Sequence, residues 1–150
     1  MISSYEIVPK VGLGDLTFGM DMEKVVSALG EPEEVDNFEG DEELNAVLLH
    51  YQDKGFSVFF EGVTRQVVAG IETDYSKATL FGEKVIGMTE EEVIKLMTRN
   101  GFPDFDKDTE EGEIRLSFEE IMVDFYMRDG KVAFVNWDVI VDEEGNVADF

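Results

Sequence analysis

The feature that most constrains this chain is an internal repeat. Residues 14–20 (GDLTFGM) return 68 positions later as residues 82–88 (GEKVIGM), and the match continues without a gap through the pairs Glu23/Glu91 and Leu29/Met97. A repeat with this period predicts that each half of the chain forms one supersecondary unit. We therefore expect two repeats, residues 1–75 and 76–150, that together make one compact domain.

Each copy of the repeated phrase runs into a short amphipathic helix pattern. In the first copy Asp21 is the expected N-cap or first-turn residue, and the pattern stops at the Gly-Glu-Pro of residues 30–32. In the second copy Thr89 and Glu92 have the spacing of a capping box, and the pattern stops at residues 100–103. These signals predict one helix in each half, the first about three turns long.

An acidic loop (residues 33–43 and 104–113) is expected after each helix, followed by three strand-like runs. The Asp-Gly pair at residues 129–130 predicts a two-residue hairpin turn between the last two runs. Short strands at residues 10–13 and 79–81 are expected to lead into the helices, and a closing hairpin is expected from residue 139 to the end. The long strands are expected at residues 48–51, 56–60 and 67–73, and at residues 114–118, 121–125 and 131–137.

This pattern predicts an α+β fold of two tandem repeats, each a short strand, a helix and a three-stranded antiparallel meander. The meanders are expected to form one continuous antiparallel sheet with both helices on one face. Strand alternation then assigns side chains to the two faces. The residues expected to face the helices are Leu49, Tyr51, Phe56, Val58, Phe60, Ile114, Leu116, Phe118, Ile121, Val123, Phe125, Ala133, Val135 and Trp137. The residues expected on the open face are His50, Ser57, Phe59, Glu72, Arg115, Ser117, Met122, Asp124, Tyr126, Phe134 and Asn136.

The charge of the chain limits its partners. Thirty-five acidic residues stand against 12 basic ones, a net charge of −23 that divides evenly between the halves. Such a charge repels nucleic acid and anionic membrane surfaces and speeds encounter with basic proteins. We therefore expect no nucleic-acid or membrane partner. The acidity serves either solubility or a basic protein partner, and composition does not choose between the two.

Several kinds of chemistry are disfavoured by the residues themselves. There is no cysteine, which excludes thiolate metal sites and cysteine nucleophiles. The glycine spacing at residues 14–19 lacks the Lys-Ser/Thr of a phosphate loop. Alternating aspartates at residues 104–108 suggest a calcium loop, but Thr109 replaces its glycine and Arg115 its bidentate glutamate. We expect no metal and no cofactor. The sequence also shows no signal-peptide pattern and no apolar run of about 18 residues, which predicts a cytoplasmic location.

The repeated phrase resembles the small helix-plus-meander modules of the outer-membrane assembly lipoprotein family of the SmpA/OmlA type. Tandem use of the module is similar to the beta-lactamase-inhibitor-protein fold, and this resemblance implies two repeats in one curved sheet that grips a target. The chain lacks the lipidation and disulfide cysteines of these groups, so the shared architecture is what the resemblance implies. The matching residues are Gly19, Met20, Val25, Leu29, Gly30 and Pro32, and then Gly87, Met88, Thr89, Val93, Gly101 and Pro103.

The leading functional hypothesis is a non-enzymatic module that binds a protein partner, possibly basic, through the open face and the acidic loops. An inhibitor or an immunity protein that neutralises a toxin is its concrete form. The chain has one histidine and no serine in a nucleophile-elbow pattern, so no catalytic residue is assigned. The expected partner-binding residues are His50, Phe59, Glu72, Arg115, Asp124, Tyr126, Phe134 and Asn136.

Two alternatives stay open at this point. The first is an enzyme or small-molecule-binding protein that uses a pocket on the same face, with His50, Asp124 and Tyr126 as a polar cluster. The second is a structural module that self-associates through the edge strands of its sheet.

Overall fold

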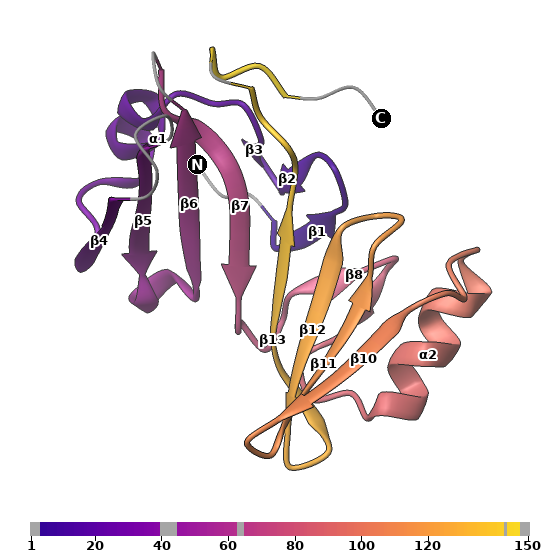
Figure 1. Cartoon of the computed structure of the whole chain (residues 1–150). Coiled ribbons are helices and arrows are strands. Elements are labelled where there is room, and N and C mark those ends of the chain that lie inside the picture. The colour runs from indigo at the N-terminus through magenta and orange to yellow at the C-terminus, as the bar shows by residue number, and fades with distance from the viewer. Residues whose placement is uncertain (1–3, 40–44, 63–64, 143, 148–150) are drawn as a thin grey trace.

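A computed structural model describes residues 4–39, 45–62, 65–142 and 144–147, and its largest element is an eight-stranded antiparallel sheet (Figure 1). The strand order is β10-β11-β12-β13-β7-β6-β5-β4, so each half of the chain supplies four consecutive strands. With two α-helices beside this sheet the fold is α+β, as predicted. The strands are β4 (Glu34–Glu39), β5 (Asn45–Tyr51), β6 (Phe56–Gly62), β7 (Val67–Thr73), β10 (Asp106–Glu110), β11 (Glu113–Phe118), β12 (Val123–Arg128) and β13 (Lys131–Asp138).

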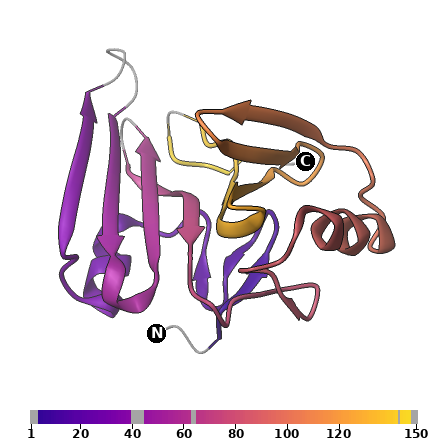
Figure 2. The ribbon, with the colours of Figure 1, turned by 90° about the horizontal axis from the view of Figure 1, so that it is seen from below.

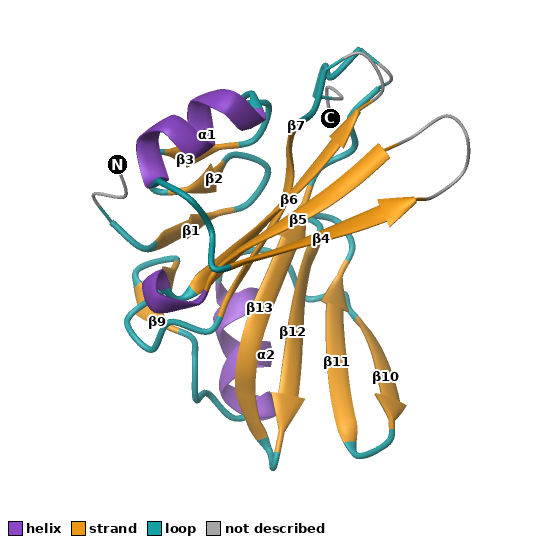
Figure 3. Ribbon diagram, turned by 90° about the vertical axis from the view of Figure 1, so that its left-hand side faces the viewer, coloured by secondary structure: helices purple, strands orange, loops and turns teal. Residues whose placement is uncertain are grey.

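The two halves meet at the centre of this sheet, where β7 pairs with β13 from Gly70↔Asp138 to Thr73↔Val135. Figures 1 and 2 show β4–β7 on one side of this seam and β10–β12 on the other. In Figure 3, β4–β6 cross β11–β13 at a clear angle, which is the accumulated twist of a long antiparallel sheet. The seam therefore lies at the middle of a strongly twisted surface.

A second sheet of five short strands, in the order β3-β2-β1-β8-β9, also joins the halves. Ile7 on β1 pairs with Leu80 on β8 in parallel, and the Trp137 indole donates a 3.1 Å hydrogen bond to the Gly12 carbonyl. The prediction of one wholly antiparallel sheet is wrong here, because these very short strands pair with each other rather than with the large sheet. They are β1 (Glu6–Val8), β2 (Gly12–Leu13), β3 (Leu16–Thr17), β8 (Thr79–Leu80) and β9 (Glu83–Lys84).

The helices are α1 (Met22–Leu29) and α2 (Glu90–Arg99), and they begin differently. The capping box predicted for α2 is confirmed: Thr89 Oγ1 accepts from the Glu92 amide at 3.2 Å, and the Glu92 carboxylate accepts from the Thr89 amide at 3.1 Å. Asp21 is the N-cap residue of α1 but makes no capping hydrogen bond. Its carboxylate lies 3.1 Å from Arg65 Nε instead.

The apolar stripes of both helices pack into one core with the inward side chains of the strands. Val25 of α1 and Val93 of α2 are buried in the same cluster as Phe60 and Phe125 of the large sheet. Trp137, on β13 at the seam, is the largest fully buried side chain of this core. Among the described residues, no α-helix covers the opposite face of the eight-stranded sheet (Figure 1).

The two acidic segments predicted as loops after the helices are strands over much of their length. β4 and β10 form the two edges of the large sheet, which gives each half four strands rather than three. All five residues of β10 are exposed. An edge strand exposed on both faces shows no apolar alternation, which is why its sequence looks like a loop. Residues 40–43 of the first predicted loop lie outside the described residues.

Three smaller expectations also need correction. The strand predicted at residues 121–125 begins at Val123, because Met122 takes a left-handed turn conformation (φ 56°). A β-bulge follows Tyr126, so Val132 is buried and Ala133 is not. The closing hairpin is reduced to a single bridge between Val141 and Val147, and residues 148–150 lie outside the described residues. The Asp-Gly hairpin turn is confirmed, with φ of 53° and 77° at residues 129 and 130.

Candidate functional site

The open face carries a row of paired residues that crosses all eight strands. Antiparallel register places His50 opposite Ser57, Ser57 opposite Glu72, and Glu72 opposite Asn136 across the seam. The row has mainly polar or charged side chains because alternation turns it away from the core. We call this the central row; from β4 to β10 it consists of Glu34, His50, Ser57, Glu72, Asn136, Asp124, Ser117 and Asp106.

Two shorter rows flank the central row on the same face. The Phe59 row runs over the first half and reaches the seam, and the Tyr126 row runs over the second half. Both follow from the register two residues away from the central row. The Phe59 row consists of Asp36, Leu48, Phe59, Gly70 and Asp138; the Tyr126 row consists of Phe134, Tyr126, Arg115 and Asp108.

His50 is held between two neighbours on adjacent strands. Its Nδ1 lies 2.9 Å from Ser57 Oγ, and its Nε2 lies 2.8 Å from Asp36 Oδ2. The three side chains have the composition of a catalytic triad, but Ser57 contacts Nδ1 rather than Nε2 and is only 9% exposed. The arrangement fixes the imidazole in one orientation. The imidazole is thereby a rigid polar group on the part of the open face that the first half of the chain forms.

A hollow of about 290 Å³ lies over Gly70, beside the seam. Phe59 and Leu48 line it as apolar walls, and Glu72 and Asp138 line it as carboxylates. A Cβ at Gly70 would lie 3.4 Å from the Cβ atoms of both Phe59 and Asp138. The hollow is therefore deeper because residue 70 has no side chain between Phe59 and Asp138.

The carboxylates at this hollow are partly removed from water. Burial, followed by repulsion from Asp124 and Glu61, raises the pKa of Asp138 to about 6. Burial of its carboxyl group also raises the pKa of Glu72, while the nearby His50 lowers it. The residue as a whole still has exposed surface. For both groups burial disfavours the charged form, and a nearby cation would favour it.

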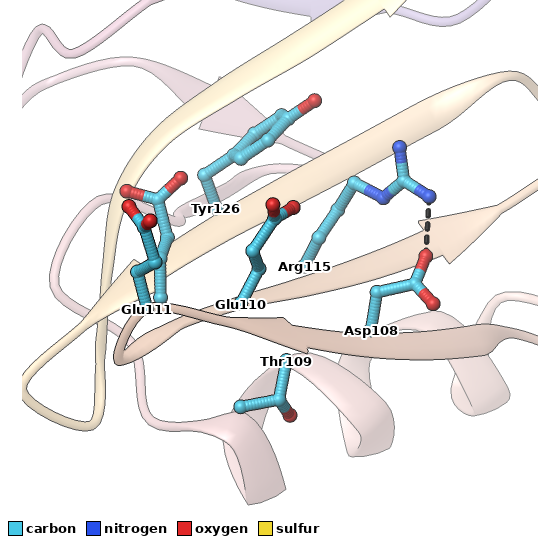
Figure 4. A pocket seen from close by; sticks show the side chains of 7 residues that line it. Asp108, Thr109, Glu110, Glu111, Arg115 and Tyr126 are labelled. Carbon is cyan, nitrogen blue, oxygen red and sulfur yellow. Dashed lines mark hydrogen bonds and ion pairs between the residues drawn. The ribbon is translucent and has the colours of Figure 1, made fainter.

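The Tyr126 row is built from aromatic and arginine side chains. The rings of Tyr126 and Phe134 stack at 4.6 Å with 12° between their planes, and the Arg128 guanidinium lies 5.3 Å from the Phe134 ring centroid. Arg115 forms an ion pair with Asp108. Figure 4 shows Tyr126, Arg115 and Glu110 on the same side of β10–β12, around a second hollow of about 640 Å³.

Two further hollows complete the face. One of about 470 Å³ lies beside His50 and Ser57 and is lined also by Glu72, Arg128 and Phe134. The other, of about 170 Å³, is lined by Ser117, Glu119, Met122, Asp124 and Asp138. Asp138 and Glu72 each border two hollows, so the carboxylates nearest the seam lie where the depressions of the face meet.

The structure places every residue predicted to bind a partner on the open face. His50, Glu72, Asn136 and Asp124 lie in the central row, Phe59 in the Phe59 row, and the rest in the Tyr126 row. The proposed polar cluster of His50, Asp124 and Tyr126 is wrong. β6, β7 and β13 separate β5 from β12, which at the usual strand spacing is about 19 Å.

Asp36, Asp138 and Gly70 are among the residues of the face that the sequence-based prediction missed. Asp36 lies in the segment predicted as a loop, Asp138 lies one residue beyond the predicted strand, and Gly70 has no side chain to mark it. Asp138 continues the alternation of Phe134 and Asn136 along β13, and this alternation could have placed Asp138 on the open face.

The part of the chain that the structure describes has neither a metal-binding group of side chains nor a membrane-spanning helix. No group of three or more His, Asp or Glu side chains there has an arrangement that could hold a metal ion. No helix among the same residues is long and apolar enough to cross a membrane.

The fold is similar to that of a known bacterial protein. No protein-family model and no curated protein matches this sequence. The uncharacterized protein YfeY from Escherichia coli matches with a TM-score of 0.56 and 13% sequence identity, over 91% of this chain and 99% of YfeY. An extracellular protein containing an SCP domain from Bacillus anthracis str. Ames matches with a TM-score of 0.45 and 16% identity, over 79% of this chain and 42% of that protein. This chain thus spans less than half of the second protein, and the likeness to YfeY concerns the fold alone.

Proposed function

We propose that this chain is a non-enzymatic, acidic binding module that holds a basic protein partner on the open face of its eight-stranded sheet. The observation that carries the proposal is the central row with its flanking hollows. Arg115 and Arg128 are cations of this face, and each already contacts a carboxylate. The carboxylates of the three rows are Glu34, Asp36, Glu72, Asp106, Asp108, Asp124 and Asp138.

The residue types of the face fit this role. Tyrosine and arginine are enriched among the residues that dominate binding at protein interfaces, and the Tyr126 row combines both with Phe134. The net charge of −23 steers a basic partner toward the molecule and makes its association rate fall with added salt. Both features support a protein partner over a nucleic acid or a lipid surface.

The test compares two variants with the same change of charge. Glu72→Gln/Asp124→Asn removes two charges from the open face, and Glu23→Gln/Glu31→Gln removes two exposed charges at α1 and just after it. The proteins are immobilised and exposed at low salt to lysate of the source organism, and captured proteins are identified. We expect wild type and the α1 variant to capture the same basic protein, and the open-face variant to bind it about tenfold more weakly.

Two results would contradict the proposal. Equal weakening by both variants would mean that overall charge, rather than the open face, holds the captured protein. An association rate that does not change between low and physiological salt would remove the electrostatic part of the proposal.

An inhibitor or immunity protein is the specific form of this proposal. Its support is the resemblance to a tandem fold that grips a protein target. Co-expression with the product of an adjacent toxin-like reading frame tests it: a stable complex and loss of toxicity are expected, and unchanged toxicity would contradict this form.

Binding of a small molecule is a second candidate, favoured by the hollow of about 470 Å³ beside His50 and Ser57. Glu72 and Asp74 line the same hollow and make it unsuitable for anionic ligands. A fragment screen by NMR tests it, with hits whose shifted amides surround residues 50, 57 and 134 as support. A screen without such hits would count against it.

A further inference from the structure

We propose that the hollow over Gly70 receives an arginine side chain of the protein partner. The inference rests on the proposed function and adds to it the chemical group that is recognised and the place where it binds. The hollow has the size of a side chain, about 290 Å³, and lies next to the seam of the sheet. A partner that covers the open face therefore covers this hollow.

The shape of the hollow follows from the residues around Gly70. Phe59 and Leu48 provide an apolar wall along one side, and Asn136, Glu72 and Asp138 provide polar atoms along the other. A side chain at residue 70 would fill the floor, because its first carbon would already lie 3.4 Å from Phe59 and Asp138. The hollow thus has room for an elongated group with an apolar stem and a polar end.

The charge of the hollow selects a cation for that polar end. Its described lining includes two carboxylates and no lysine or arginine. Asp124 lies next to Asn136 in the central row and adds a third negative charge nearby. Burial and the repulsion from Asp124 raise the pKa of Asp138, and the attraction of a cation in the hollow acts in the opposite direction.

Arginine fits these surroundings better than lysine or a metal ion. A guanidinium is planar, is weakly hydrated and stacks on aromatic rings, so it can lie against Phe59 while it donates to a carboxylate. It has five N–H donors, and Asn136 and Glu72 supply acceptors beside Asp138. A lysine ammonium is strongly hydrated and gains less from the aromatic wall. These carboxylates do not belong to any group of described side chains that could hold a metal ion.

The experiment uses a short peptide as the probe because the partner is unidentified. Acetyl-Gly-Arg-Gly-amide is titrated into the full-length, ¹⁵N-labelled protein and followed by NMR. Peptides with citrulline or lysine in place of arginine serve as matched probes, since citrulline keeps the shape and loses the charge. We expect saturable shifts centred on the amides of Phe59, Gly70 and Asp138 with the arginine peptide, and binding about fivefold weaker with lysine and weaker still with citrulline.

Three variants locate the site. Gly70→Leu fills the hollow without a change of charge, and Asp138→Asn removes a charge without a change of shape. Glu23→Gln removes an exposed charge on α1, outside the rows and hollows of the open face. We expect the first two to weaken the arginine peptide about fivefold or more and Glu23→Gln to leave it within about twofold of wild type. The isosteric Asp138→Asn variant decides the test if Gly70→Leu does not fold.

The failure of this inference differs from the failure of the proposed function. Equal binding of the citrulline or lysine peptide, or unchanged binding by Asp138→Asn, would overturn the arginine site. Capture of the basic partner that survives Gly70→Leu but is lost in Glu72→Gln/Asp124→Asn would overturn it too, and would leave the open face as the binding surface. If all of these variants still capture the partner as wild type does, the proposed function itself is overturned.

Discussion

Asp138 and Gly70 face each other across the seam between the two halves, and their properties depend on each other. The absence of a side chain at Gly70 opens the hollow, and the hollow is where the Asp138 carboxylate meets Phe59 and Glu72. A carboxylate in such a place is available to a partner's cation, but it destabilises the free protein. The effect on stability can be measured without knowing the partner.

We expect Asp138→Asn to stabilise the folded protein at neutral pH. The pKa of Asp138 is about 6 in the folded state and near its ordinary value of 3.8 in the unfolded chain. The folded state therefore binds this proton more tightly, and the contribution of Asp138 to stability falls as pH rises from about 4 to 6. Asparagine removes this loss. We expect the free energy of unfolding in urea at pH 7.5 to rise by about 1 kcal/mol, after allowance for the partial exposure of the carboxyl.

The pH dependence separates this cause from a general effect of charge. The gain from Asp138→Asn should be smaller at pH 5, where the folded wild type already carries the proton. Asp15→Asn, which removes the same charge at an exposed position, is the control. An equal gain at both pH values, or in both variants, would mean that reduced net repulsion explains the stabilisation.

At this scale, a period of two along each strand was enough to place the eight predicted residues on the open face. It failed where the backbone departs from regular pairing. The bulge after Tyr126 exchanges the faces of Val132 and Ala133, and the turn at Met122 delays the start of β12. Side-chain partners from other strands, such as Asp36 for His50, depend on which strands become neighbours, and the sequence of one strand does not contain this information.

The helices show how a capping pattern translates into structure. Both helix starts were predicted, but only that of α2 has a complete set of side-chain caps. Asp21, at the start of α1, is used for an ion pair with Arg65 next to β7, where it also forms a bridge with Val67. The two N-cap residues therefore stabilise the fold by different contacts.

We expect Thr89→Ala to reduce the free energy of unfolding by about 1 kcal/mol, because it leaves the Glu92 amide without its acceptor. Asp21→Ala should cost less, a few tenths of a kcal/mol, because it removes an exposed ion pair and no capping hydrogen bond. Urea unfolding of the two variants and wild type at pH 7.5 measures both. Equal losses would contradict the difference between the two helix starts.

The two edge strands of the large sheet are among the elements that sequence reasoning missed. Neither β4 nor β10 has regular apolar alternation in its sequence, and all five residues of β10 are exposed to water. Their acidic residues also oppose pairing with the edge of another molecule at neutral pH, because like charges repel across a new strand pair. Self-association through these edges stays an alternative prediction, and this repulsion is the physical reason to rank it below partner binding.

The two halves of the molecule share one hydrophobic core although the sequence is repetitive. The halves share the β7–β13 ladder, the parallel β1–β8 pair and the hydrogen bond from Trp137 to Gly12. The helix of each half also packs into a common core. The prediction of an α+β fold holds at this scale. The pairing of short segments from opposite halves could not be predicted, because the sequence pattern of each half was considered separately.

We expect neither residues 1–75 nor residues 76–150 to fold alone. Each fragment would expose a central strand, β7 or β13, and one side of the small sheet. Circular dichroism should show no cooperative unfolding of either fragment, and mixing them should restore a cooperative transition and dispersed NMR signals. A cooperative transition in one isolated fragment, with stability near that of the full chain, would contradict the shared core.

The hydrogen bond from Trp137 to Gly12 joins residues that are 125 positions apart. Closing so long a loop carries a large entropy loss before any native contact repays it, which places this contact late in folding. During synthesis the small sheet lacks β8 until residue 80 has left the ribosome, and Trp137 emerges only after β8. The apolar residues of the first half that the second half covers therefore lack this cover in the nascent chain. Exposed apolar surface favours aggregation, and the negative charge of the chain opposes it.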